Sequence, residues 1–271
     1  MRNLLKADLY RIFHDKAIYV GSIIIAIFEF LTAILFLIIK ISASSMIENP
    51  VAAEELRNQF SFVALLASST SFTGNMGLVI FIISIVFLTR EFSFGTIRNK
   101  VISGHSKTKI YLSTSITSII IGSGLYIVNL FTSIIFGLIF LGTGIITSTT
   151  LSQVCVGLLF AILLSFFFSL LACFYSMVIK TSGLSIVAYV ASVLVIAGLS
   201  KVYELSSSFP KWVFTLCEFN PIYQINLVAS AMSDFSLYTQ EIVLIMSFSL
   251  VFYIAFITII GALIFRKCDL K

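Results

Sequence analysis

The sequence predicts an all-α membrane protein that crosses the bilayer several times. Hydrophobic residues make up 59% of the 271 positions and charged residues only 11%, whereas about a quarter of the residues in a soluble domain are charged. Several apolar runs reach the roughly 20 residues that a helix needs to cross the hydrocarbon core. They are apolar on all sides, unlike the alternating strands of a membrane barrel.

Six apolar segments are predicted as transmembrane helices of a single domain, residues 1–271. The segments are 17–39, 62–88, 112–141, 154–179, 184–200 and 242–265. The second contains "SSTSFTGN" at 68–75, a stretch too polar for lipid that must face protein or water.

Residues 1–16, before the first span, are predicted to form an interfacial helix. Leu5, Leu9, Ile12 and Phe13 follow helical spacing, a pattern typical of a helix that lies in the headgroup plane. Asp8 lies near this apolar face and interrupts it.

The positions of the cations predict the topology. If the N-terminus is cytoplasmic, only four of the 17 Lys and Arg residues lie outside: Lys40, Arg57, Lys201 and Lys211. The other 13 lie inside, and six spans return the C-terminus to the same side. We therefore expect both termini in the cytoplasm.

The cytoplasmic connection between spans two and three, residues 90–109, mixes cations with apolar residues. Phe94, Ile97 and Val101 are spaced i, i+3 and i+7, which predicts a two-turn helix with one apolar face. Gly104 is expected to end this helix and Ser106 to cap the next one. The apolar face has two open interpretations, contact with lipid headgroups or insertion into a groove of another protein.

The outer loop, residues 201–241, is too apolar to be a free loop. Pro210 and Pro221 interrupt any continuous helix, and Trp212 favours the level of the headgroups. We expect two short re-entrant helices here that dip into the outer leaflet, next to Asn220 and Pro221 in "FNPIY".

This order of segments resembles the permease subunit of an ABC-2 type ATP-driven transporter. The resemblance rests on E-F-x-x-G-T-I-x-N within "REFSFGTIRNKVISGHSKTKIYLS" (90–113) and on the Asn220-Pro221 pair before the last span. It implies that the 90–109 loop holds a coupling helix that enters a cleft of a separate nucleotide-binding subunit. The residues implied for packing are Phe92, Phe94, Ile97 and Val101, and those implied for pairing at the rim are Glu91, Arg98 and Lys100.

The chain contains no G-x-x-x-x-G-K-[ST] motif, so it is expected to bind no cofactor and to be no enzyme; catalytic and metal-binding residues are not predicted either. The resemblance implies that ATP and Mg²⁺ are bound by two copies of an ABC ATP-binding subunit. It also implies a second permease copy, in a homodimer or heterodimer, in a bacterial plasma membrane. The compact build is similar to exporters of amphipathic peptides, such as phenol-soluble modulin and bacteriocin-immunity permeases.

Glu29 lies midway along the first predicted span. An ionised side chain at this depth costs about 2.5–3.5 kcal/mol on insertion scales. Ser22 and Thr32 share its side of the helix, so the three residues are candidates for a translocation path. The alternative is a protonated Glu29 that is hydrogen-bonded to a neighbouring helix.

Two other function classes were weighed against an ATP-driven exporter. An intramembrane enzyme needs a positioned nucleophile, metal set or carboxylate pair, and neither H-E-x-x-H nor G-x-S-x-G occurs. An ion-gradient-driven secondary transporter is the main alternative, and it usually shows repeats and broken helices.

Overall fold

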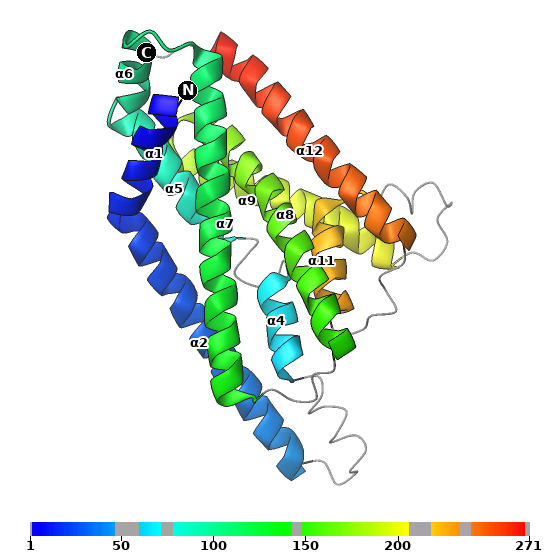
Figure 1. Cartoon of the computed structure of the whole chain (residues 1–271). Coiled ribbons are helices and arrows are strands. Elements are labelled where there is room, and N and C mark those ends of the chain that lie inside the picture. Colours follow the sequence, from blue (N-terminus) through cyan, green and yellow to red (C-terminus); the bar gives the residue numbers. More distant parts are fainter. Residues whose placement is uncertain are drawn as a thin grey trace.

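The computed structural model describes residues 2–46, 60–71, 78–142, 148–205, 218–232 and 240–268. Every regular element in these ranges is a helix (Figure 1). The helices are α1 (Arg2–His14), α2 (Lys16–Met46), α4 (Phe62–Thr70), α5 (Val79–Ser93), α6 (Thr96–Ile102), α7 (Lys107–Phe140), α8 (Ser148–Ile179), α9 (Ser182–Leu205), α11 (Pro221–Ala231) and α12 (Gln240–Lys267).

Five of these helices, α2, α7, α8, α9 and α12, are long and apolar enough to cross a bilayer. The number rises to six if α5 and α6, which meet at an angle of 56°, are counted as one bent span. The predicted all-helical, multi-pass character is therefore confirmed, with five to six candidate spans.

The interval 62–88, predicted as one span, contains two helices. α4 ends at Thr70, and Ser71 has an extended backbone with φ −64° and ψ 159°. The hydroxyl groups of Ser69, Thr70 and Ser71 donate to backbone carbonyls of the preceding turn, a local competition that weakens helices. α5 has 15 residues and is shorter than the roughly 20 residues that span a bilayer.

α7 is the central helix of the array and packs against α1, α2, α4, α5, α8 and α12. Small polar residues make its approach to α8 close: Ser118 Oγ donates to the Ser169 carbonyl oxygen at 2.6 Å, and a Cβ atom at Gly122 would lie 2.0 Å from Ser169 Oγ. Small residues allow such proximity between helices in a membrane.

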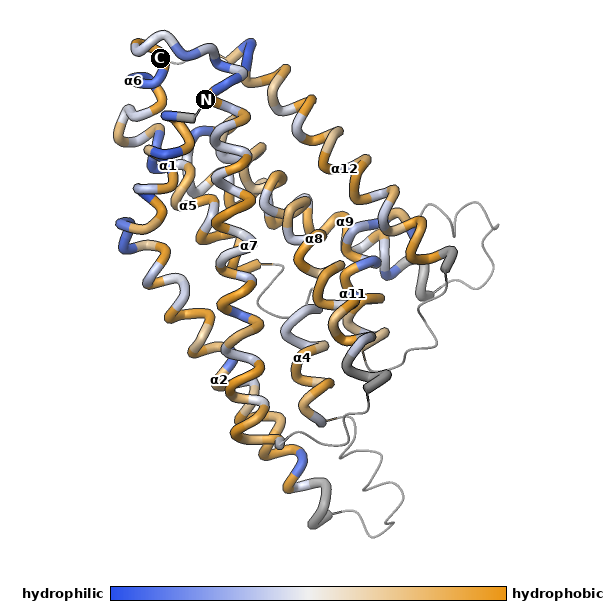
Figure 2. Tube along the Cα trace, in the orientation of Figure 1, coloured by the Kyte–Doolittle hydropathy of each residue, from blue (hydrophilic) through white to orange (hydrophobic). Residues whose placement is uncertain are grey.

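Charged and polar residues gather at one end of the molecule. α1, α6, the start of α7 and the end of α12 lie together there (Figure 1), and the trace is most hydrophilic at this end (Figure 2). Lys107 Nζ donates to the Cys268 carbonyl oxygen at 2.6 Å, joining α7 to the end of α12. We call this the polar end; the cytoplasmic orientation of both termini is a prediction for it.

α1 packs against the protein through a face that the sequence did not predict. Leu4, Asp8 and Ile12, each four residues apart, are buried, and α1 packs against α7. Phe13, on the face predicted to meet the headgroups, is 66% exposed. Asp8 lies at the centre of the packed face because it has an ionic partner on α6 and a hydrogen-bond partner on α7.

Candidate functional site

The site is built on the sharp elbow between α5 and α6 at the polar end. Gly95 stands at the bend with φ +67°, a left-handed conformation that glycine adopts without a steric cost. Thr96 Oγ1 donates to the Glu91 carbonyl oxygen at 2.8 Å, which fixes the start of α6 to the end of α5. Gly104, with φ +85°, follows α6, and Ser106 Oγ accepts from the backbone N–H of Lys109, so the predicted stop and cap are confirmed.

A buried network of charges holds this elbow in place. Lys100 Nζ on α6 lies 2.8 Å from Asp8 Oδ1 on α1 and 3.0 Å from Glu91 Oε2 on α5. Arg11 on α1 pairs with the other oxygen of Glu91, and its guanidinium carbon lies 4.3 Å from the centre of the Phe87 ring. The two cations balance the two carboxylates.

The same network reaches α7 through Ser113, whose Oγ donates to Asp8 Oδ2 at 3.0 Å. Side chains from α1, α5, α6 and α7 are thus connected by hydrogen bonds and ion pairs. Because Asp8 and Glu91 are almost completely buried, little water screens these pairs. A displacement of α6 would therefore be passed on to α1, α5 and α7.

The elbow divides the predicted coupling residues into two groups. Ile97 is buried, and Phe92 and Val101 pack partly buried against the hydrophobic core. Glu91 and Lys100, expected at the rim of a partner's cleft, are bound inside the chain by the network instead. Their place at the rim was implied by the family resemblance, which does not show that Asp8 and Arg11 of α1 reach them.

Among the exposed residues of the elbow are three with large side chains. Phe94 is 76% exposed and Ile102 is 75% exposed, and Arg98 between them is also exposed. They are four residues apart, and we call them the elbow stripe. An exposed Arg between two exposed apolar residues is typical of a protein–protein contact, where aromatic residues and Arg are enriched.

Sequence reasoning missed the role of Asp8 and Arg11. Asp8 falls four residues from both Leu4 and Ile12, so it stands on the apolar face of its helix. An acid in that position predicts a buried partner, because an unpaired buried charge is very costly. The partner itself, 92 residues away, has no local signal.

The predicted path residues on α2 do not form one connected group. Glu29 is 2% exposed and lies in line with Gly21, Ile25 and Ala33, the buried face of α2. Ser22 Oγ and Thr32 Oγ1 are half-buried and donate to carbonyl oxygens of their own helix. This arrangement favours a structural role for Glu29 over a place in an open path.

We therefore expect Glu29→Gln to leave the amount of folded protein unchanged, because glutamine has nearly the same shape and keeps hydrogen-bonding groups at this buried position. Glu29→Lys should lower the amount of folded protein severalfold, since an ammonium group would enter packed apolar surroundings. The measurement is size-exclusion recovery in detergent. Equal recovery of the two variants would contradict a structural role for Glu29.

On the far side of the fold, Asn220 and Pro221 start the short helix α11. Asn220 Oδ1 accepts from the backbone N–H of Ile222 at 2.9 Å, and its Nδ2 donates to the Ile196 carbonyl oxygen of α9 at 2.8 Å. Pro221 occupies the first turn, where no donor is needed. Pro210 and Trp212 lie outside the described residues.

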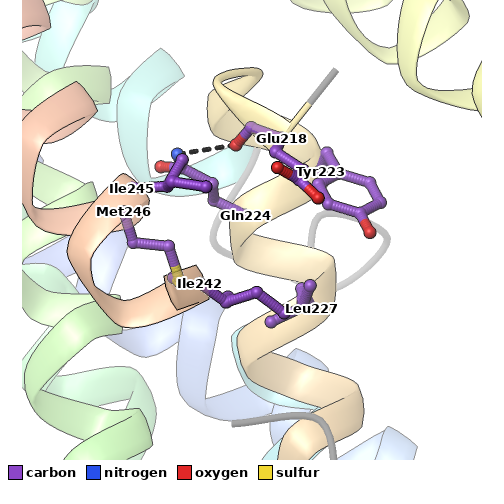
Figure 3. Close-up of a pocket in the computed structure, with 7 residues that line it drawn as sticks. All are labelled: Glu218, Tyr223, Gln224, Leu227, Ile242, Ile245 and Met246. Carbon is purple, nitrogen blue, oxygen red and sulfur yellow. Dashed lines mark hydrogen bonds between the residues drawn. The ribbon is translucent and has the colours of Figure 1, made fainter. Parts of the chain in front are cut away.

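α11 is joined to α12 by a buried amide. Gln224 Nε2 donates to the Glu218 carbonyl oxygen at 2.9 Å (Figure 3) and to Ser249 Oγ on α12. The adjoining cavity has a volume of about 10 Å³, at the lower limit for one water molecule. It is too small for cargo.

Comparison with known proteins does not identify the family. No protein-family model matches the chain, and no curated protein matches it. The functional assignment consequently depends on the elbow and on the resemblance described above.

Proposed function

We propose that the chain is the membrane-spanning permease subunit of an ATP-driven exporter of the ABC-2 type. The observation that carries the proposal is the elbow: α6 is anchored through the Lys100 network, while Phe94 at the end of α5 and Arg98 and Ile102 on α6 are exposed at the polar end. A coupling helix needs both properties, an exposed contact and a stiff connection to the spans.

The packing of α6 supports a protein partner over a lipid surface. A helix that lies on a membrane buries its apolar face in lipid. The apolar face of α6 contains Ile97 and Val101, which are packed against the protein core and are not available to lipid. The large side chains that stay exposed here are those of the elbow stripe, in which Arg98 lies between Phe94 and Ile102 in the sequence.

In this proposal an ABC ATP-binding subunit binds ATP and Mg²⁺ and docks on the elbow stripe. Two ATP-binding subunits and two permease copies, identical or different, form the transporter in the plasma membrane of a bacterium, with both termini of this chain in the cytoplasm. The cargo is hydrophobic or amphipathic, such as toxin or antimicrobial peptides. Helical peptides of this kind partition into the bilayer first, and lateral entry between spans then follows.

A secondary transporter driven by an ion gradient is the second candidate. The break between α4 and α5 and the short helix α11 favour it, because broken helices are common in such transporters. The two candidates differ in their need for an ATP-binding partner.

The elbow stripe is tested by the double substitution Phe94→Asp and Arg98→Glu. Expressed in the native membrane with the ABC ATPase that co-purifies with the wild-type chain, this variant should capture at least tenfold less ATPase than the wild type, because a buried apolar contact and a charge of the right sign are both lost. The measurement is affinity co-purification followed by quantitative immunoblotting.

Phe13→Asp is the matched control, since Phe13 is similarly exposed but lies on α1. It should leave capture of the ATPase unchanged. Equal capture by the double variant and the wild type would rule out the elbow stripe as the docking surface, and equal losses in both variants would indicate a general effect on the membrane interface.

A further inference from the structure

A hollow beside the elbow is lined in part by the turn between α8 and α9. Its volume is about 190 Å³, and it lies between the α5–α6 elbow and the end of α8. The lining residues are Glu91, Phe92, Ser93, Gly95, Ile97, Arg98 and Lys180. Lys180 is the first residue after α8, so the short α8–α9 turn takes part in this surface.

Two cationic side chains line the hollow. Both oxygens of Glu91 already face cations inside the chain, Oε1 toward Arg11 and Oε2 toward Lys100. The other two ionisable side chains that line the hollow are Arg98 and Lys180. A guanidinium and an ammonium on the same hollow favour a carboxylate or phosphate ligand.

The backbone of Lys180 is an independent indication of function. Among the residues that the structure describes, Lys180 is the one non-glycine residue with positive φ, at +67°. A residue just after a helix C-terminus in this conformation is usually Gly or Asn, and both would be less strained than lysine. A strained residue that also lines a hollow is a reason to look for a role of its side chain.

We propose that the hollow receives an acidic side chain of the ATP-binding subunit, held between Arg98 and Lys180. The inference rests on the proposed function and extends it: the partner contacts the α8–α9 turn as well as α6. Arg98 belongs both to the hollow and to the elbow stripe, so the two surfaces adjoin. A protein that docks on the elbow stripe would therefore also reach the hollow. Closure of the ATP-binding subunits then acts on α8 and α9 directly, and not only through α5 and α7.

The test uses the full chain in phospholipid-free neutral detergent with the ABC ATPase that co-purifies with the wild-type chain. Lys180→Asn removes the charge and suits the left-handed backbone; it should weaken ATPase binding about tenfold. Lys180→Arg keeps the charge and should bind within twofold of the wild type. Lys109→Asn, which removes an exposed cation at the same end of the molecule, is the matched control and should also bind within twofold.

A zero-length carbodiimide cross-link should join Lys180 to an Asp or Glu of the ATPase, and it should disappear in Lys180→Arg although binding persists. Wild-type binding by Lys180→Asn would overturn the proposal. So would a defect that appears only in vesicles containing phosphatidylglycerol, which would assign the hollow to a lipid phosphate.

The Phe94→Asp and Arg98→Glu variant separates this inference from the proposed function. If that variant loses the ATPase while Lys180→Asn keeps it, only the role of the hollow is wrong. If the wild-type chain binds no ATPase at all, the proposed function and the inference both fail.

Discussion

Lys100→Met is expected to lower the free energy of unfolding by about 3–5 kcal/mol, the range for removing one partner of a buried ion pair. The side chains of Asp8 and Glu91 are 3% and 0% exposed, and that of Lys100 is 13% exposed. Without the ammonium group, Glu91 keeps only Arg11 as an ionic partner, and Asp8 keeps the hydrogen bond from Ser113 but loses its ionic partner.

Arg90→Met is the matched control for Lys100→Met. Arg90 pairs with Asp15 at 3.0 Å, but the two side chains are 43% and 17% exposed, so the loss should be only about 0–1 kcal/mol. The measurement is equilibrium unfolding in mixed detergent micelles. Equal losses in the two variants would contradict the description of the Lys100 network as a structural anchor.

A double variant measures the coupling within that network. Asp8→Asn removes one buried carboxylate but keeps an acceptor for Ser113, so Asp8→Asn with Lys100→Met should be more stable than Lys100→Met alone. The difference from additivity gives the interaction between the two residues.

Gly122→Ala should destabilise the fold by about 1–3 kcal/mol, the usual result of adding atoms to a packed core. The new Cβ atom would lie 2.0 Å from Ser169 Oγ and 3.1 Å from Ser169 Cβ. Ser118 holds the helices together at this level by its hydrogen bond to the Ser169 carbonyl oxygen. α7 and α8 must therefore separate, or Ser169 must leave its position.

Gly124→Ala on the same helix is the control, because no atom lies within 4 Å of the Cβ position there. It should be neutral or slightly stabilising, as alanine is the better helix former. Adding Ser169→Ala to Gly122→Ala should restore part of the loss, since it removes the nearest atom. A Gly122→Ala protein as stable as Gly124→Ala would show that α7 and α8 are not closely packed at Gly122.

Local patterns in the sequence predicted much of the fold. The long apolar runs predicted the five helices that are able to cross a bilayer, because a helix satisfies its own backbone hydrogen bonds in lipid. Gly104 and Ser106 marked helix ends correctly, since each acts on its neighbours in the chain. The break after α4 was anticipated only as a polar stretch in an otherwise continuous span.

The candidate site was harder to predict because its decisive contacts are not local. Glu91 and Arg11 are 80 residues apart in the chain, and both resemble surface charges in the sequence. The role of Lys180 depends on the packing of the α8–α9 turn beside α6, which no periodicity reveals. The elbow loop was identified correctly as an unusual surface, but its residues could be divided into buried and exposed groups only in the folded chain.

The most direct test of the account is transport by the purified chain in sealed lipid vesicles, with a fluorescent amphipathic helical peptide as cargo. The account predicts that accumulation requires both ATP and an ABC ATPase that binds the chain, and that it is lost with Phe94→Asp and Arg98→Glu. Accumulation driven by an ion gradient, with no ATPase in the vesicles, would contradict it.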